Sequence, residues 1–453
     1  MTTFDAIIIG TGQSGPSLAI RLAGAGWKVA VVERKLFGGT CVNTGCIPTK
    51  TLVASARAAH IARRAAEFGV VLNGPVAVDM KRVKARKDAV VRDSHDGVEK
   101  QLKSTPNCTV IEAQARFEGP HTVRAGDQLL TAENIFIDVG GRASIPPIPG
   151  LHDAAYLTNS SMMDVDFLPA HLIVLGGSYV GLEFAQMYRR FGSEVTIVER
   201  GESLIEHEDE DISRAVREIL EAEGIRIVTG AANVRVATTN GVTKLAWDGG
   251  EASGSHLLVA VGRIPNTGDL GLDAAGVATD GRGFIQVDDR LRTTAPGIWA
   301  MGDCNGKGAF THTSYNDYEI VAANLLDGDA RRVTDRILAY NLYIDPPLGR
   351  AGMTERDVRQ AGRKALMATR PMTRVARAVE KGETQGFLKV LVDPHTRQIL
   401  GASLLGVECD EVIHSILDLM YARAPYTVMQ RAVHIHPTVS ELLPTLLGDL
   451  KPL

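Results

Sequence analysis

The chain has few cysteines, little net charge and no long apolar run. Five cysteines among 453 residues are too few for disulfides to stabilise the fold, so we expect a reducing, cytoplasmic compartment. No apolar run approaches the roughly 18 residues of a membrane span, and the first residues lack the charged region and apolar core of a signal peptide. The sequence therefore predicts no membrane association, and any close pair of cysteines needs a chemical explanation.

The charges nearly cancel, because 49 basic and 53 acidic residues give a net charge of −4. This balance excludes a global attraction to nucleic acid or to a membrane surface. The basic run from Lys81 to Lys87 lies in a helical pattern, so it is predicted to be a solvated helix face. At roughly 150 residues per domain the length predicts about three domains. We expect small molecules as partners, and no nucleic acid.

The first half of the chain contains one unit twice. The segments GTGQSGPSLAIRLAGAGWKVAVVER, from position 10, and GGSYVGLEFAQMYRRFGSEVTIVER, from position 176, align without a gap at a constant offset of 166. Each copy follows a short apolar run, Ala6 to Ile9 or Leu172 to Leu175, typical of a strand buried on both faces. A glycine-rich turn, an amphipathic helix and a second apolar run ending in Glu complete it. The sequence therefore predicts an α/β fold with two Rossmann-like dinucleotide-binding domains.

The glycines of such a turn let the backbone approach a pyrophosphate, whose charge is met by free N–H groups and the helix dipole. Glu33 and Glu199 follow at the distance expected for a carboxylate that binds ribose hydroxyls. Glu199 favours NADH, since it would repel a 2′-phosphate, although Arg200 beside it leaves NADPH possible. Ser178 replaces the middle glycine of the second turn, so the more exchangeable dinucleotide is expected there. The predicted dinucleotide contacts are Gly10, Gly12, Ser14, Gly15, Glu33, Arg34, Gly176, Ser178, Tyr179, Val180, Gly181, Glu199 and Arg200.

A pair of cysteines follows the first unit directly. Cys41 and Cys46 stand five residues apart in GGTCVNTGCIPTK, before Pro48 and a helical pattern from Thr49 to about Phe68. A lone pair is a poor zinc site, which needs four ligands, so no metal site is predicted. Redox chemistry is favoured over two ordinary buried residues, because a helix N-terminus lowers the pKa of a thiol. The other three lack this context and are expected to be structural: Cys108, Cys304 and Cys409.

The segment Cys41-Val-Asn-Thr-Gly-Cys46-Ile-Pro-Thr-Lys50, joined to two nucleotide units, resembles the class I pyridine nucleotide-disulfide oxidoreductases. This family includes dihydrolipoyl dehydrogenase, glutathione reductase and mercuric reductase, and the resemblance covers essentially the whole chain. It implies FAD at the first unit, NAD(P)H at the second and a redox-active Cys41–Cys46 disulfide. It also implies that Cys46 faces the flavin, that Cys41 exchanges with substrate, that Lys50 pairs with Glu183 near the flavin, and that Tyr179 covers the nicotinamide pocket.

Further segments match the family in the same order along the chain. Ile298 to Asp303 resembles a second FAD signature, whose carboxylate binds a ribityl hydroxyl, and Phe310-Thr311-His312 would open a helix facing the flavin. Val259 to Thr267 resembles the crossover that leaves the NAD domain. Ile137 to Gly141 departs from the usual ATG pattern, so the resemblance does not determine the detail of that flavin-side loop. The positions that this resemblance adds to the predicted cofactor contacts are Gly39, Thr40, Lys50, Ala115, Gly140, Gly262, Asp303, Phe310 and Thr311.

Near the C-terminus stands His436-Pro-Thr-Val-Ser-Glu441. A Glu five residues after a His can bond its ring and raise its basicity, although such pairs are more often ordinary surface pairs. The resemblance favours the catalytic interpretation, with His436 as base and Glu441 as its orienting partner. In the family this base reaches the disulfide of the other subunit, which implies a homodimer.

The resemblance also implies the domain limits: FAD-binding at 1–150, completed by about 268–335, NAD(P)-binding at 151–267, and a C-terminal α+β dimerisation domain at 336–453. In the last of these the sequence predicts strands at 337–344, 387–392 and 398–404, and helices at about 411–422 and after Thr438.

The predicted function is electron transfer from NADH through FAD and the Cys pair to a disulfide or dithiol substrate, as in dihydrolipoyl dehydrogenase. One alternative is a mercuric or other metal-ion reductase of the reactive-chlorine-resistance type, which the stretch from Gly10 to Ala56 resembles. True mercuric reduction is less expected, because no Cys pair stands near Leu453. A redox-sensing flavoprotein without turnover is a third interpretation, and it has no evident need for His436 and Glu441.

Overall fold

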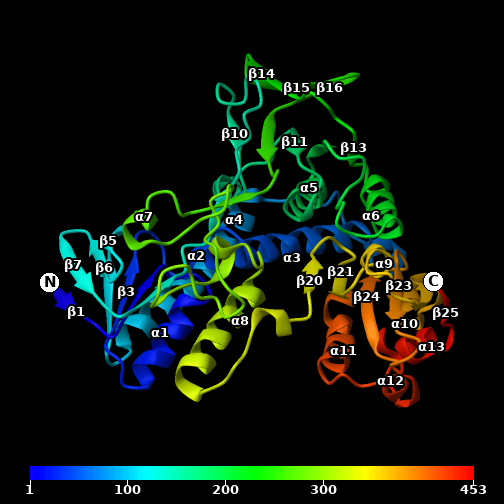
Figure 1. Ribbon diagram of the computed structural model, residues 1–453. Helices are drawn as coiled ribbons and strands as arrows, with labels where there is room; N and C mark the ends of the chain where they lie inside the picture. The colour runs from blue at the N-terminus through cyan, green and yellow to red at the C-terminus, as the bar shows by residue number, and fades with distance from the viewer.

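Three lobes meet around helix α3 (Cys46–Arg63) in the computed structural model, which describes residues 1–453 (Figure 1). The two lobes formed by the first three quarters of the chain each contain a five-stranded parallel sheet, and the C-terminal lobe contains a six-stranded antiparallel sheet. The predicted α/β class is therefore confirmed. None of the helices combines the length and the apolar character needed to cross a bilayer.

The first parallel sheet has the order β19-β8-β2-β3-β4. Its central strand β2 is buried at every residue, as its apolar run predicts. Helix α1 (Gly15–Gly24) connects β2 to β3, so the first predicted βαβ unit is present. The strands are β19 (Ile298–Ala300), β8 (Asn134–Ile137), β2 (Ala6–Ile9), β3 (Val29–Glu33) and β4 (Cys108–Glu112).

The second parallel sheet repeats this plan, with the order β10-β17-β11-β12-β13. Helix α5 (Tyr179–Phe191) connects β11 to β12, as α1 connects β2 to β3. Both halves of the sequence repeat therefore fold in the same way. The strands are β10 (Tyr156–Leu157), β17 (His256–Val259), β11 (His171–Leu175), β12 (Glu194–Val198) and β13 (Arg226–Val228).

The C-terminal sheet has the order β20-β21-β24-β23-β22-β25 and pairs antiparallel throughout. The predicted hairpin is β23 (Phe387–Val392) with β24 (Ile399–Leu405), and the predicted strand at 337–344 is shorter, β20 (Ala339–Leu342). The other elements of this lobe are β21 (Leu348–Gly352), β22 (Leu366–Pro371), β25 (Lys451–Pro452), α9 (Glu355–Gln360), α10 (Ala376–Glu380), α11 (Cys409–Tyr421), α12 (Thr427–Arg431) and α13 (Leu443–Gly448).

Smaller sheets and helices complete the two nucleotide lobes. A four-stranded sheet, β1-β7-β6-β5, and a three-stranded sheet, β14-β15-β16, flank the parallel sheets, and β9 pairs with β18 where the chain crosses between lobes. These elements are β1 (Thr2–Thr3), β5 (Ala115–Gly119), β6 (Thr122–Ala125), β7 (Gln128–Thr131), β9 (Gly141–Ala143), β14 (Arg235–Thr239), β15 (Val242–Trp247), β16 (Gly250–Gly254), β18 (Arg263–Pro265), α2 (Gly39–Asn43), α4 (Met80–Ser104), α6 (Glu210–Ala222), α7 (Leu272–Ala275) and α8 (Thr311–Ala322).

Two expectations about helices need correction. Helix α3 begins at Cys46, not at Thr49, and ends at Arg63, before a separate 3₁₀ turn from Ala65 to Phe68. The basic run in α4 is not wholly solvated, because Lys87 is buried and donates to the carbonyl of Met163 at 2.7 Å. Local charge periodicity could not predict that one lysine turns inward.

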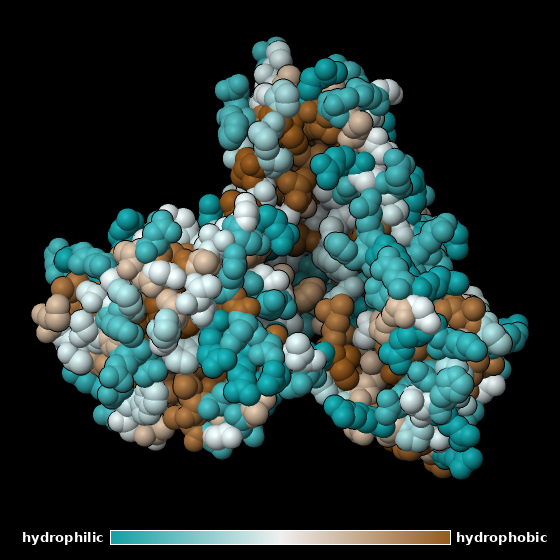
Figure 2. Space-filling model, viewed as in Figure 1, coloured by the Kyte–Doolittle hydropathy of each residue, from teal (hydrophilic) through white to brown (hydrophobic).

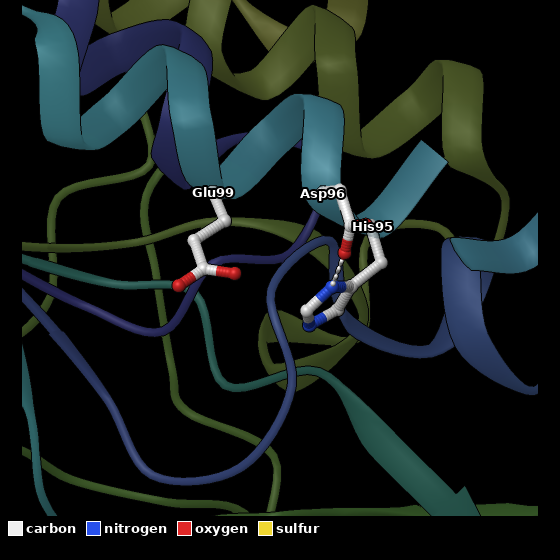
Figure 3. Close-up of side chains that lie close together, drawn as sticks. All are labelled: His95, Asp96 and Glu99. Carbon is white, nitrogen blue, oxygen red and sulfur yellow. Dashed lines mark hydrogen bonds and ion pairs between the residues drawn. The ribbon is translucent and has the colours of Figure 1, made fainter. Parts of the chain in front are cut away.

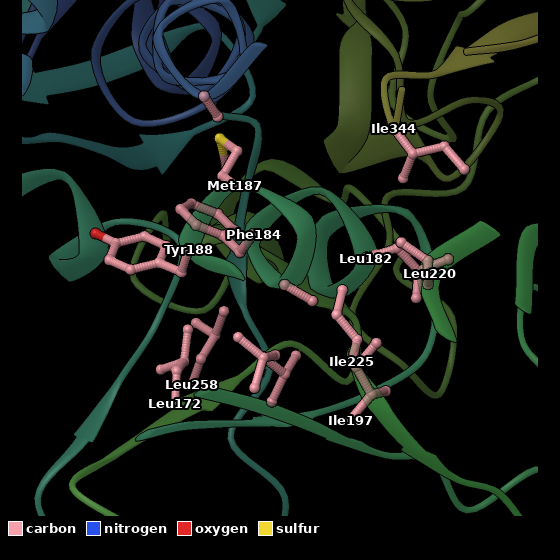
Figure 4. Packing of buried hydrophobic residues seen from close by; sticks show 14 of the residues in the cluster. Leu172, Leu182, Phe184, Met187, Tyr188, Ile197, Leu220, Ile225, Leu258 and Ile344 are labelled. Atoms are coloured by element: carbon pink, nitrogen blue, oxygen red, sulfur yellow. The ribbon is translucent and has the colours of Figure 1, made fainter. Parts of the chain in front are cut away.

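The largest apolar cluster is shared between the lobes. It has 29 buried residues, including Leu52 of α3, Leu182 of α5 and Leu348 of β21. Figure 4 shows residues of α5 and the second parallel sheet on one side and Ile344, from the C-terminal lobe, on the other. In Figure 2 the surface is hollowed where the three lobes meet. The lobes are therefore packed into one body around this hollow.

Candidate active site

The first glycine-rich loop lies between β2 and α1, and its glycine positions have no room for a side chain. A Cβ atom on Gly10 would lie 2.2 Å from the carbonyl oxygen of Asp138, and one on Gly15 would lie 2.5 Å from that of Gly10. Gly10 also has a φ of +102°, which glycine adopts without strain. The bare backbone and the N-terminus of α1 therefore fit the pyrophosphate of a dinucleotide such as FAD.

The second loop repeats this geometry between β11 and α5. A Cβ atom on Gly176 would lie 2.4 Å from the carbonyl oxygen of Ala260, and one on Gly181 would lie 2.2 Å from that of Gly176. Ser178 precedes the helix, and its hydroxyl makes no capping hydrogen bond. It is therefore free to donate to a phosphate, and the loop fits a second dinucleotide.

The two carboxylates of the repeat make the same backbone contacts. Glu33 accepts from the N–H of Thr11 at 3.0 Å and of Lys35 at 2.8 Å. Glu199 accepts from the N–H of Gly177 at 2.5 Å and of Gly201 at 2.7 Å. A carboxylate has about four acceptor positions, so Glu199 retains positions for two ribose hydroxyls. The loop thus presents the carboxylate beside the site expected for the adenosine.

Asp138 explains the departure from the family pattern in the flavin-side loop. It is buried, and its carboxylate accepts from the N–H of Gly15, at the start of α1, at 2.7 Å. Burial raises the pKa of Asp138 well above its usual range. Ala260 holds the equivalent place in the second lobe. The backbone N–H of Asp138 donates to the carbonyl of Ile9 at 2.8 Å, and that of Ala260 donates to the carbonyl of Leu175 at the same distance. Sequence reasoning found the departure but not this contact.

The two cysteines lie beside the N-terminus of α8. Cys41 is in α2, and Cys46 is the first residue of α3. The hydroxyl oxygen of Thr311 lies 3.0 Å from Cys46 Sγ and donates to Cys41 Sγ at 3.1 Å. One hydroxyl, 265 residues along the chain from Cys46, therefore contacts both sulfurs.

The two thiols differ in acidity. The hydrogen bond from Cys41 is the largest effect on Cys46, and with the Thr311 bond and the charge of Lys50 it lowers the Cys46 pKa to about 6, although partial desolvation of the sulfur opposes this. The same bond to Cys46, and burial, raise the pKa of Cys41. Near neutral pH the dithiol form thus holds one thiolate, on Cys46, and one thiol, on Cys41.

Lys50 and Glu183 form an ion pair next to the cysteines. Lys50 Nζ donates to both carboxylate oxygens of Glu183, at 2.8 and 3.0 Å, and lies 4.6 Å from the ring centroid of Tyr343. The backbone N–H of Tyr343 also donates to Glu183 at 3.0 Å. The structure therefore brings together residues of all three lobes at this point.

The remaining predicted contacts surround the two loops. Arg34 pairs with Asp269 at 2.5 Å, and Asp303 lies 3.5 Å from Arg263. Burial raises the pKa of Asp303. Phe310 caps α8 directly before Thr311. The others lie in loops or at the ends of elements in the same two lobes: Gly12, Ser14, Gly39, Thr40, Ala115, Gly140, Val180, Arg200 and Gly262.

His436 and Glu441 form the predicted pair, but apart from the cysteines. His436 Nδ1 lies 2.9 Å from the nearer oxygen of Glu441. The His436 side chain is 72% exposed, and the neighbouring Ile435 is 81% exposed. Figure 1 separates the segment before α13 from α2 and the start of α3. Within one chain the pair therefore does not join the sulfur site.

Helix α4 places a second group of titratable residues outside this site (Figure 3). His95 Nδ1 lies 3.0 Å from Asp96, while Glu99 accepts from Lys103 at 2.6 Å. The ring of His95 packs edge-on against Phe37, with centroids 5.9 Å apart. Ion pairing and aromatic packing account for these contacts.

Comparison with known proteins agrees with this geometry. Residues 4–317 match the family model for pyridine nucleotide-disulphide oxidoreductases, and residues 338–447 match the dimerisation domain of that family. The probable pyridine nucleotide-disulfide oxidoreductase RclA of Escherichia coli K12 is 38% identical over 100% of both chains. A dihydrolipoyl dehydrogenase of Thermus scotoductus is 34% identical and covers 97% of this chain and 96% of its own.

Solved structures show the same likeness. The Cu(II) complex of the HOCl-induced flavoprotein disulfide reductase RclA from Escherichia coli matches with a TM-score of 0.90 and 38% identity, covering 98% of this chain and 99% of that one. Family membership implies FAD and a pyridine nucleotide, which the two glycine loops fit. The chain belongs to the pyridine nucleotide-disulphide oxidoreductase family and is a flavoprotein disulfide oxidoreductase.

Proposed function

We propose that this enzyme uses NADH and FAD to reduce or oxidise the Cys41–Cys46 pair, which exchanges electrons with a small disulfide or dithiol. The single observation that carries this proposal is the contact of the Thr311 hydroxyl with both sulfurs, at 3.0 and 3.1 Å. It lies beside the Lys50–Glu183 ion pair, where the lobes that carry the two dinucleotide loops meet. A redox sensor without turnover would have no evident need for a base that is oriented as His436 is by Glu441.

The first loop would hold FAD and the second NADH. Bound FAD would supply the two-electron chemistry that links hydride transfer from the nicotinamide to the reduction of the sulfur pair. Glu199 supports NADH, because its backbone-held carboxylate would repel a 2′-phosphate. In this proposal residues 1–150 and 268–335 form the FAD domain, 151–267 the NAD domain and 336–453 the dimerisation domain.

Each thiol has a separate task in the proposed exchange. Cys41 loses its proton and attacks a substrate disulfide, which forms a mixed disulfide and releases one substrate thiol. The Cys46 thiolate then attacks Cys41 Sγ, which closes the Cys41–Cys46 disulfide and releases the second substrate thiol. The reverse sequence oxidises a dithiol. The raised pKa of Cys41 explains why this thiol needs a base.

His436 is the proposed base, acting on the cysteines of a partner subunit in a homodimer. Its ring is exposed and is oriented by Glu441, and the apolar Val433 and Ile435 beside it are 100% and 81% exposed. Exposed apolar side chains next to an oriented base suit a surface that a second copy covers. The match to a dimerisation domain over residues 338–447 supports this arrangement.

Anaerobic titration of the holoenzyme with NADH tests the proposed roles. A thiolate on Cys46 next to the flavin produces a long-wavelength charge-transfer band as the pair is reduced. Cys46→Ser should abolish this band, whereas Cys41→Ser should retain it, because the proposal assigns the flavin-facing position to Cys46 alone. A band that survives in Cys46→Ser would show that the two roles are wrongly assigned.

A second candidate function is the reduction of a soft metal ion such as Cu(II). It is favoured by the solved Cu(II) complex of RclA and by a mercuric reductase of Bacillus cereus that is 30% identical over 95% of this chain. Thiolates are suitable ligands for such ions. NADH oxidation measured in parallel with lipoamide, glutathione disulfide, Cu(II) and Hg(II) separates the candidates. The proposed disulfide activity is wrong if the metal ions accelerate NADH oxidation and neither lipoamide nor glutathione disulfide does.

A further inference from the structure

Tyr179 stands between the second dinucleotide loop and the sulfur pair. It is the first residue of α5, directly after the loop. Its ring lies edge-on to Phe310, with centroids 6.5 Å apart, and Phe310 directly precedes the Thr311 that contacts both sulfurs. A nicotinamide that extends from this loop towards the cysteines must therefore pack against this ring or displace it.

The Tyr179 hydroxyl is tied to a buried carboxylate. It donates to Glu208 at 3.2 Å, and Tyr340 of β20 donates to the same oxygen at the shorter distance of 2.6 Å. The Tyr340 ring lies edge-on to Tyr179, with centroids 5.5 Å apart, and stacks on Phe310 at 5.2 Å. Tyr179 is thus held by the hydrogen bond of its hydroxyl to Glu208 and by the packing of the Phe310 and Tyr340 rings against its own ring.

The anchor of this contact is a fully buried charge pair. The Glu208 side chain is 0% exposed and that of Arg350 is 1% exposed, and Arg350 Nε lies 3.4 Å from the second oxygen of Glu208. This second oxygen has no hydrogen bond, and neither does Arg350 Nε. Glu208 therefore cannot turn to solvent, and the two tyrosine hydroxyls are its hydrogen-bond donors.

We infer that Glu208 is a positioning residue that holds Tyr179 closed, and that the Tyr340 hydroxyl opposes this by competing for the same oxygen, so that the two residues set how readily the pyridine nucleotide binds. This inference rests on the proposed function. Two hydroxyls share one oxygen, and the Tyr340 bond is the shorter one. The Tyr340 hydroxyl therefore weakens the hydrogen bond between Tyr179 and Glu208. The Tyr179 ring can swing away while Glu208 keeps its shorter hydrogen bond to Tyr340. The C-terminal lobe, which supplies Tyr340 and Arg350, thereby tunes access to the nucleotide lobe.

The inference predicts opposite effects from two similar substitutions. Tyr179→Phe removes the tie, raises the fraction of open molecules and tightens nucleotide binding. Tyr340→Phe keeps the stacked ring but leaves the oxygen to Tyr179 alone, which favours the closed state and weakens binding. The apparent dissociation constant varies inversely with the open fraction, and a hydrogen bond to a charged group at the weak end of its range corresponds to a change of about tenfold.

The experiment measures binding of NAD⁺ to the oxidised holoenzyme by calorimetry, and the rate of flavin reduction by NADH in stopped flow. Tyr188→Phe is the matched control, because Tyr188 is buried on the same helix and its hydroxyl makes no hydrogen bond to the protein. We expect about tenfold tighter binding for Tyr179→Phe and about tenfold weaker binding for Tyr340→Phe, with Tyr188→Phe unchanged. The limiting reduction rate at saturating NADH should stay the same in Tyr340→Phe and Tyr188→Phe, because neither residue is a predicted cofactor contact.

Two outcomes would overturn the inference. One is a dissociation constant for both tyrosine variants equal to that of Tyr188→Phe. The other is a shift of both in the same direction, which a merely structural role would produce. Failure of the proposed function is distinguishable, because it would appear in the wild type as NADH oxidation that no disulfide accelerates, whereas the inference concerns only the difference in nucleotide binding between the variants.

Discussion

The hydroxyl of Thr311 helps to keep Cys46 ionised, because its hydrogen bond lowers the pKa of that thiol. Replacing Thr311 by the isosteric valine tests this. With a pKa of about 6 for Cys46 in the dithiol form, about ten thiolates exist per thiol near neutral pH. The Thr311 oxygen lies 3.0 Å from Cys46 Sγ and 3.1 Å from Cys41 Sγ. Its single proton turns towards whichever sulfur is charged, so Thr311→Val removes a donor to the thiolate.

The expected size of the effect follows from the bond that is lost. A hydrogen bond to a charged group is worth about 1.5 kcal/mol at the weak end of its range, the end expected for the exposed Cys46. About 1.4 kcal/mol corresponds to one pKa unit. We therefore expect Thr311→Val to raise the pKa of Cys46 by about one unit and to leave about half of it ionised near neutral pH.

Alkylation of the reduced protein by iodoacetamide, measured as a rate against pH, reports this pKa. Cys108, Cys304 and Cys409 do not interfere, because burial raises the pKa of each. Thr51→Val is the control, since its hydroxyl lies on the same helix as Cys46 and donates to the carbonyl of Ile47. The reasoning is refuted if Thr311→Val and Thr51→Val titrate at the same pH.

Three other substitutions give further predictions. Asp138→Asn should stabilise the protein increasingly as pH rises above the ordinary Asp pKa of about 4, because a carboxyl whose folded-state pKa is raised loses its contribution to stability as pH rises towards that pKa; thermal melts of both forms would show a constant difference if this is wrong. Glu199→Gln should reduce the preference for NADH about tenfold, and the ratio of kcat/KM for NADH and NADPH measures it. Glu441→Gln should slow thiol–disulfide exchange about 100-fold, because His436 loses its orienting charge, without slowing flavin reduction; equal loss in both half-reactions would contradict the assignment.

The sequence predicted the parts of the site that local patterns determine. Apolar runs and glycines located both βαβ units, because a strand buried on both faces and a turn without side chains leave a direct trace in the chain. The start of α3 was placed three residues late. Pro48 was taken to mark the first turn of a helix from Thr49, but this proline is the third residue of a helix that starts at Cys46.

Contacts between distant residues left no such trace. Tyr340 meets Glu208 across 132 positions, and nothing near either residue indicates the other. Lys389 is buried among three carboxylates, at 2.9, 2.7 and 2.8 Å from Asp209, Asp211 and Glu355, and these too lie far from it in the chain. Such networks are determined by how the lobes pack, which composition and periodicity do not encode.

The shared apolar cluster restricts how this enzyme can move. Because Leu52, Leu182 and Leu348 belong to one continuous core, a hinge that swung one lobe away would expose apolar surface from all three. We therefore expect turnover to need rotations of single side chains and no movement of whole lobes, so that the two dinucleotide loops and the cysteine pair stay at fixed separations. For the same reason, removal of any one lobe should expose the apolar side chains that the remaining lobes contribute to this cluster.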